Sequence, residues 1–185
     1  MMQELSMNIL DVAENSIRAG ATLVGIEIDE KPSRNLLIVT ISDNGCGMSP
    51  EQVKNVTDPF YTTRLTRKVG LGVPFFKMAA ELTGGKFVIE SEVGKGTDVR
   101  ADFVRSSIDL MPLGNINETI CSLIYCNPQI DFLYTRRLED KEMTLDTREF
   151  RRILGGIGLN DPSVSKFIRE YLAENTADLL SGSEE

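Results

Sequence analysis

The chain has 185 residues, of which 41% are hydrophobic and 26% charged, and its formal net charge at pH 7 is −8. This is the composition of a globular protein that can bury one full domain and a smaller appendage. The acidic balance disfavours a nucleic-acid partner, because phosphate binding depends mainly on lysine and arginine. No apolar run approaches the roughly 18 residues of a membrane-spanning helix, and the start lacks a secretory signal. We therefore expect a cytoplasmic protein with no membrane association.

The histidine and cysteine content limits the reactions and metal sites that the chain could support. The chain contains no histidine, which excludes a histidine nucleophile, general base or metal ligand within it. Its three cysteines, Cys46, Cys121 and Cys126, cannot all pair and lack the spacing of metal ligands. We expect reduced thiols.

The first half of the chain predicts alternating helices and strands. Apolar residues recur at helical spacing over 4–19, and Gly20 ends this helix. Strands are expected at 23–28 and 36–41, a short helix after Ser49, a helix from about 70 to 82, and strands at 86–90 and 97–104. Residues 57–69 have no apolar periodicity and contain three basic residues, which is typical of a functional or mobile loop.

The second half is less regular. We predict helices at 116–125, 146–154 and 162–172, with short strands at 130–134 and 143–145. A face formed by Ile120, Leu123, Ile124, Ile130, Phe132 and Leu133 could pack on the first half of the chain or on a second copy of the protein.

Asp43-Asn44-Gly45-Cys46-Gly47-Met48 directly follows the second apolar strand. The arrangement places one carboxylate beside a backbone with few side chains, which suits a flat, nitrogen-rich ligand. The carboxylate can accept a hydrogen bond from an exocyclic amine. The same residues also suit an ordinary strand-to-turn junction, so the motif alone leaves both interpretations open.

A second polar feature lies on the first predicted helix. Asn8, Asp11, Asn15 and Arg18 are spaced by three, four and three residues, so they form one stripe. A solvated helix face is the usual explanation of such a stripe, and a binding surface is the alternative.

Several motifs together resemble a known superfamily. Glu14-Asn15-Ser16, Ala19-Gly20-Ala21-Thr22 and the segment from Asp43 to Met48 resemble the ATP-binding domain of the mismatch-repair protein MutL. Segments 58–64, 69–72, 84–86 and 91–97 are similar to the ATPase domain of sensor histidine kinases. Both belong to the GHKL superfamily, and the resemblance covers residues 1 to about 105 with motifs in the family order.

The resemblance implies an α+β fold of the Bergerat type, a two-layer α/β sandwich. Helices would cover one face of a mixed four- or five-stranded sheet. Residues 1–105 would form the ATP-binding domain, 106–175 a small α/β extension, and 176–185 an acidic flexible tail.

The resemblance also implies ATP and Mg²⁺ as ligands. Asn15 would hold Mg²⁺ through its side-chain oxygen, the ligand type that this cation prefers. Asp43 would accept a hydrogen bond from the adenine amine, and Thr97 would bind adenine directly or through water. The remaining expected contacts with the base come from Gly45, Gly47 and Met48.

For the phosphates, the resemblance implies backbone N–H groups of Gly70, Leu71 and Gly72 at a helix start, where the helix dipole favours anions. The basic segment before them would be a lid, with Lys68 or Arg67 meeting the terminal phosphate. Ordinary solvated charges are the alternative there. A Walker-type loop is excluded, because Gly94-Lys95 is followed by Gly96 instead of a hydroxyl residue.

One position departs from the family. MutL-like and gyrase-like hydrolases have a glutamate four residues before the magnesium asparagine, whereas this chain has Asp11. The shorter side chain would hold a water further from the γ-phosphate, and a misplacement of about 1 Å can cost ~10²-fold in rate. Glu14 is the second candidate carboxylate, but it is adjacent to Asn15 and less suitably directed.

We therefore expect a small stand-alone, histidine-kinase-like Mg-ATP-binding protein, either a slow ATPase with Asp11 as base or a nucleotide-driven switch acting on a partner protein. The alternatives are an anti-sigma-like serine/threonine protein kinase and a non-hydrolysing ATP-sensing module. Self-phosphorylation on histidine is excluded within the chain, and a homodimer stays open.

Overall fold

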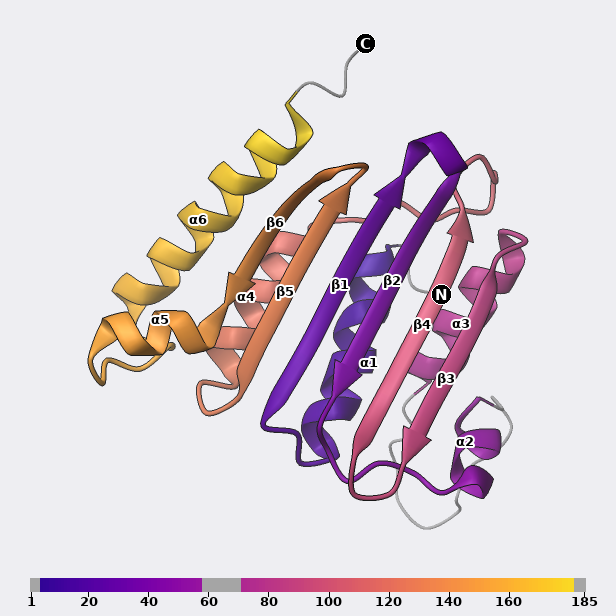
Figure 1. Ribbon diagram of the computed structural model, residues 1–185, viewed down its shortest axis with the longest axis horizontal. Coiled ribbons are helices and arrows are strands. Elements are labelled where there is room, and N and C mark those ends of the chain that lie inside the picture. Colours follow the sequence, from indigo (N-terminus) through magenta and orange to yellow (C-terminus); the bar gives the residue numbers. More distant parts are fainter. Residues whose placement is uncertain (1–3, 58–70, 182–185) are drawn as a thin grey trace.

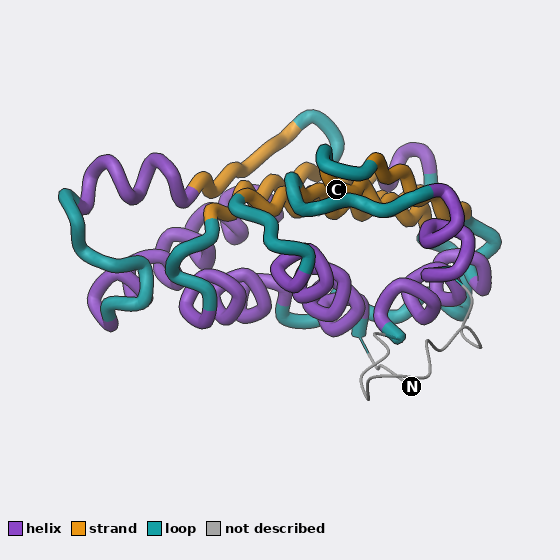
Figure 2. The backbone as a smooth tube through the Cα atoms, turned by 90° about the horizontal axis from the view of Figure 1, so that it is seen from below, coloured by secondary structure: helices purple, strands orange, loops and turns teal. Residues whose placement is uncertain are grey.

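The computed structural model describes residues 4–57 and 71–181. In this part of the chain a six-stranded mixed sheet has the order β3-β4-β2-β1-β5-β6. Figure 2 shows the strands as one layer with the long helices gathered on one side of it. The predicted α+β class with helices on one sheet face is confirmed.

The elements follow the chain as labelled in Figure 1. The helices are α1 (Leu5–Arg18), α2 (Pro50–Val56), α3 (Gly72–Leu82), α4 (Ile116–Cys126), α5 (Thr147–Leu154) and α6 (Pro162–Leu180), with a 3-10 turn at Pro32–Arg34. The strands are β1 (Leu23–Lys31), β2 (Leu36–Asp43), β3 (Lys86–Glu92), β4 (Gly96–Val104), β5 (Asp131–Leu138) and β6 (Lys141–Asp146).

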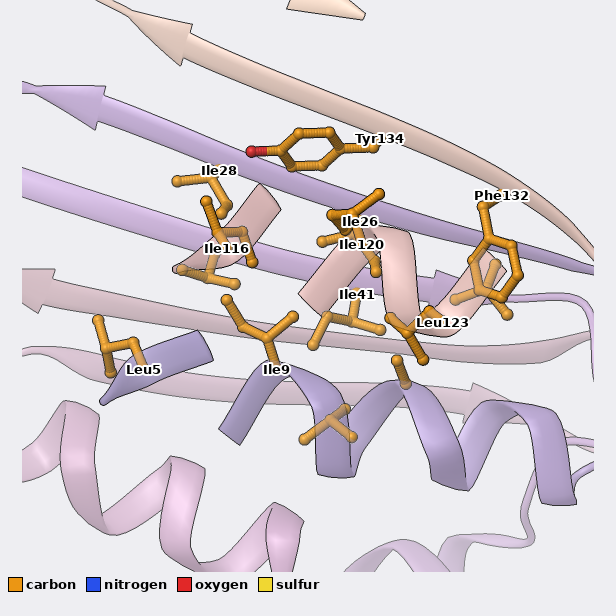
Figure 3. Packing of buried hydrophobic residues seen from close by; sticks show 14 of the residues in the cluster. Leu5, Ile9, Ile26, Ile28, Ile41, Ile116, Ile120, Leu123, Phe132 and Tyr134 are labelled. Carbon is orange, nitrogen blue, oxygen red and sulfur yellow. The ribbon is translucent and has the colours of Figure 1, made fainter. Parts of the chain in front are cut away.

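The core forms where alternate strand residues meet the helices. Ile26 lies opposite Ile41, and Ile28 opposite Val39, across the antiparallel β1–β2 pair. Because neighbouring residues of a strand point to opposite faces, this register places all four side chains on the same side of the sheet. Figure 3 shows three members of this row, Ile26, Ile28 and Ile41, together with Leu5 and Ile9 of α1 and apolar residues of α4.

The predicted strand number is wrong, because the strands after residue 105 join the same sheet. β5 lies parallel to β1, from the pair Leu23–Asp131 to the pair Glu30–Leu138, and β6 pairs with β5. The apolar face expected around Ile120 and Leu123 is buried in the common core. That face therefore packs within the chain.

The last helix is longer than predicted. α6 continues to Leu180, and Leu179 is buried against the core. The Thr176 hydroxyl and the Asn117 side chain are also hydrogen-bonded to one another. Over 176–180, where a flexible tail was expected, the chain is helical, and these contacts offset the low intrinsic order of a chain end.

Over residues 4–57 and 71–181, no helix is both long enough and apolar enough to cross a membrane.

Candidate functional site

Three polar residues form a row across the sheet, where β2 and β3 end and β4 begins. These strand ends lie at the bottom of the sheet in Figure 1. Asp43 of β2 is directly opposite Thr97 of β4, and Thr97 is directly opposite Ser91 of β3. Thr97 is on the same face of β4 as the buried residues Val99 and Ala101, because the three positions are two residues apart. The row therefore points to the side of the sheet that carries α1 and α3.

Asp43 is held in one orientation by two donors. The Ser16 hydroxyl of α1 donates to Oδ2 at 2.6 Å, and the Gly45 backbone N–H donates to Oδ1 at 2.8 Å. Each carboxylate oxygen has a second lone pair. Asp43 is only partly buried, so the carboxylate can still accept a hydrogen bond from a ligand.

Ser16 had no predicted role, although its sequence position carries a signal. It follows Ile9 and Val12 on the apolar face of α1, and it is itself buried. A hydroxyl on the core face of a helix needs a partner. The partner is Asp43, which lies 27 positions further along the chain.

Backbone packing requires glycine at Gly47 of the Asp43 motif and at Gly96, where β4 begins. Gly47 has φ of 65°, and a Cβ there would lie 2.0 Å from the carbonyl oxygen of Glu92. Gly96 has φ of 121°, and its Cβ would lie 1.9 Å from the carbonyl oxygen of Asp43. The two turns are thus in close contact, which shapes the end of the sheet. The turn interpretation therefore applies to this motif, and the binding interpretation stays a prediction.

Ser91 connects these turns. Its hydroxyl accepts a hydrogen bond from the Met48 backbone N–H at 2.8 Å. It donates to the Gly96 carbonyl at 2.9 Å and also contacts the Thr97 hydroxyl at 2.8 Å. Met48 and Thr97, both predicted to bind the base, therefore share one partner that the sequence did not single out.

The predicted phosphate end of the site lies along α1. Asn15 accepts a hydrogen bond from Arg18 at 3.4 Å, and Glu14 forms an ion pair with Arg18 at 2.8 Å. Glu14 is thus engaged with Arg18, whereas Asp11 has neither an ion pair nor a side-chain hydrogen bond among the described residues.

Burial raises the pKa of the Asp11 carboxyl above its ordinary value, the negative charge of Glu14 raises it further, and Arg18 opposes both. A carboxylate whose pKa is raised in this way holds a proton more readily, which is the property that a general base requires.

The start of α3 lies against Asp11. A Cβ at Gly72 would lie 2.7 Å from the Cβ of Asp11, so glycine permits the close approach of α3 to α1. This brings the predicted phosphate-binding helix start next to the predicted base. Leu71 precedes the helix and is exposed. Lys68 and Gly70, predicted to bind phosphate, lie outside the described residues, as does Arg67.

The polar stripe on α1 is not a uniformly solvated face. Asn8 is buried, and neither of its side-chain polar atoms has a hydrogen-bond partner among the described residues. Arg18 at the other end of the stripe is exposed. The stripe thus runs from the core at Asn8, past Asp11 and Asn15, to solvent.

The magnesium ion that the family resemblance implies would be held by one side-chain oxygen of this chain, that of Asn15. No group of three or more acidic, cysteine or histidine side chains that could hold a metal occurs in 4–57 and 71–181. Mg²⁺ usually takes one or two protein oxygens, and its other ligands are waters and phosphate oxygens. The single side-chain oxygen of Asn15 fits that arrangement through its second lone pair, since Arg18 donates to the first.

Comparison with known proteins finds sensor proteins that are similar to this chain. A sensor protein from Shewanella frigidimarina is 35% identical over 109 residues, covering 58% of this chain and 17% of that protein. The sensor protein SrrB of Staphylococcus aureus is 36% identical over 101 residues, covering 52% of this chain and 17% of SrrB. The chain thus spans about a sixth of the length of these relatives.

Solved structures show the same fold. The ATPase domain of Aquifex aeolicus MutL complexed with ADP aligns over 100% of both chains with a TM-score of 0.53 and 15% identity. The N-terminal domain of a DNA repair protein aligns over 78% of this chain and 53% of its own, with a TM-score of 0.57 and 14% identity.

The family match covers the same part of the chain as the site. Residues 1–107 match the family described as histidine kinase-, DNA gyrase B-, and HSP90-like ATPase. This range contains Asp11, Asn15, Asp43 and Thr97, together with Ser16 and Ser91. The chain belongs to this GHKL family of ATP-binding domains.

Proposed function

We propose that this protein binds Mg·ATP, hydrolyses it slowly, and acts as a nucleotide-driven switch on a partner protein. The observation that carries the proposal is the Asp43 carboxylate, held by Ser16 and Gly45 beside Thr97. A carboxylate that is fixed by two donors and still accessible is well suited to bind an exocyclic amine. The family membership and the ADP-bound MutL domain of the same fold support adenine as the base.

The residues along α1 would serve the triphosphate. Asn15 would hold Mg²⁺, which neutralises phosphate charge when it is bound. Asp11 would accept the proton of an attacking water, and its raised pKa supports this role. Glu14 would keep Arg18 close to Asn15 through its ion pair.

A calorimetric titration with ATP and Mg²⁺ tests the binding step. Asp43→Asn should weaken ATP binding about 10- to 100-fold, because a charge-assisted hydrogen bond is worth roughly 1.5–3 kcal/mol. Asp98→Asn is the matched control, since Asp98 follows Thr97 on β4 and points to the opposite sheet face. Equal ATP affinity in the Asp43→Asn variant and the wild type would refute the assigned adenine site.

Transfer of the γ-phosphate of ATP to a partner protein is the second candidate function. Asp11 in place of the family glutamate favours phosphate transfer over hydrolysis. The shorter side chain holds an attacking water less well, whereas a partner protein can position its own hydroxyl against the γ-phosphate. A transfer of labelled γ-phosphate to a serine or threonine of a co-purified protein would establish the kinase function. Release of free phosphate alone would support the ATPase.

A further inference from the structure

The Ser91 hydroxyl lies at a junction of three polar groups around the proposed adenine site. Its oxygen is 2.8 Å from the Met48 backbone nitrogen, 2.9 Å from the Gly96 carbonyl oxygen, and 2.8 Å from the Thr97 hydroxyl oxygen. Ser91 and Thr97 face one another on neighbouring strands, and both are partly buried.

The direction of each hydrogen bond follows from counting protons. A hydroxyl has one proton and two lone pairs, an amide N–H can only donate, and a carbonyl oxygen can only accept. Ser91 must therefore give its proton to Gly96 and accept from Met48. Its second lone pair is left for Thr97, which donates its own proton to Ser91. The Thr97 hydroxyl is then limited to accepting hydrogen bonds from any other group.

Asp43 has the same restriction for a different reason. The ionised carboxylate has no proton, and its two oxygens accept from Ser16 and Gly45. Asp43 and Thr97 are directly opposite one another. This pair therefore presents hydrogen-bond acceptors, and no side-chain donor, to a base lying beside it.

We propose that Ser91 is a specificity-determining residue that acts through Thr97 and makes the site select a purine with an exocyclic amine. This inference rests on the proposed function. The amino group of adenine has two protons and matches two acceptors. A purine with a carbonyl at the same position, such as hypoxanthine, places an acceptor against acceptors and leaves these partly buried groups unpaired.

ATP and inosine triphosphate (ITP) are the probes, since their phosphates and ribose are the same. Calorimetric titrations with Mg²⁺ give the ratio of the ITP and ATP dissociation constants. We expect the wild type to prefer ATP by about 100-fold, and Ser91→Ala to lower this preference about 10-fold. Without Ser91 the Thr97 hydroxyl can rotate and donate to the hypoxanthine carbonyl, so much of the change should appear as tighter ITP binding.

Further variants separate this effect from a general disturbance of the turn. Ser91→Thr keeps the hydroxyl and should retain the wild-type preference. In a Thr97→Val background, Ser91→Ala should leave the ITP-to-ATP ratio unchanged, because the residue through which it acts is absent. Ser42→Ala removes a hydroxyl from the opposite face of β2 and should also leave the ratio unchanged.

The outcomes are distinct. If the wild type binds neither nucleotide, the proposed function fails. If the wild type binds ATP but Ser91→Ala has the wild-type preference, this inference alone is overturned. It is also overturned if Ser91→Ala changes the ITP-to-ATP ratio by the same factor in the wild type and in the Thr97→Val background. Should Ser91→Ala not fold, the near-isosteric Ser91→Cys replaces it, because a thiol is a weak hydrogen-bonding group. An unchanged preference in folded Ser91→Cys overturns the inference as well.

Discussion

At the scale of single residues, the site depends on side chains whose neighbours change their chemistry. Asp43 is fixed by a hydroxyl and an amide, whereas Asp11 is partly buried next to Glu14, and its pKa is raised. The first carboxylate is thereby suited to binding and the second to accepting a proton. The sequence predicted both residues, but it did not predict Ser16 or Ser91, whose partners come from other elements.

Asp11→Asn should abolish most phosphate release, by about 100-fold or more, and leave the ATP dissociation constant within about 3-fold. Release assays and calorimetry on the same preparation measure the two effects. Equal loss of binding would show that Asp11 contacts the nucleotide and does not act as the base.

The same variant should not destabilise the protein at neutral pH. The pKa of Asp11 is higher in the folded protein than its ordinary value of 3.8, so the folded protein binds this proton more tightly than the unfolded chain does. The contribution of Asp11 to the free energy of unfolding therefore falls as the pH rises above that value. Denaturant titrations should therefore show Asp11→Asn gaining stability relative to wild type between about pH 4 and pH 7. A loss over that range would contradict the assignment.

Asp11→Glu tests whether the short side chain at position 11 limits the rate of ATP hydrolysis. The added methylene restores the family's carboxylate position, and we expect faster phosphate release by about 10-fold or more, since about 1 Å of misplacement costs ~10²-fold. The Asp11 side chain lies close to Gly72 of α3, so the ATP dissociation constant should be measured as the control for packing. A slower Asp11→Glu variant with normal affinity would argue against hydrolysis through this residue.

At the scale of elements, most helices and strands could be predicted because apolar periodicity is a local property. The predicted helix over 4–19 corresponds to α1 at Leu5–Arg18, and both predicted strands of the first hairpin occur. The length of α6 could not be predicted, since its last turn is stabilised by contacts with a distant helix. The contact between the turns at Gly47 and Gly96 likewise requires the folded sheet.

Gly96→Ala and Gly94→Ala form a matched pair for this contact. Both glycines have positive φ, of 121° and 80°, but a Cβ at Gly94 meets nothing within 4 Å, whereas one at Gly96 overlaps the Asp43 carbonyl. Gly94→Ala should cost about 1–2 kcal/mol of stability and retain ATP binding. Gly96→Ala should cost more and weaken ATP binding by displacing β2. Thermal unfolding and calorimetry measure the difference, and identical behaviour would exclude the steric explanation.

At the scale of the whole molecule, residues 106–181 complete the sheet that carries the site. β5 covers the edge of β1, and α4 packs with α1 over the same core (Figure 3). A cut at residue 105 would expose that strand edge and the apolar faces beneath it. The predicted domain boundary thus crosses one continuous sheet and one continuous core.

We therefore expect a chain of residues 1–105 to lack cooperative unfolding and to bind no ATP, while a chain of residues 1–181 retains both properties. Circular dichroism during denaturation and calorimetry distinguish the two chains. A cooperative, ATP-binding 1–105 fragment would establish an independent domain ending at that boundary.

The order of elements, the ATP-binding family and the candidate carboxylates could be predicted from the sequence, because motif spacing and side-chain periodicity are properties of neighbouring positions. Three contacts could not be predicted and are seen only in the folded chain: Ser16 with Asp43, Ser91 with Met48 and Thr97, and β5 with β1. These pairs depend on strand register and helix packing. Both arise from the cooperative burial of the whole core, which no local stretch of sequence specifies.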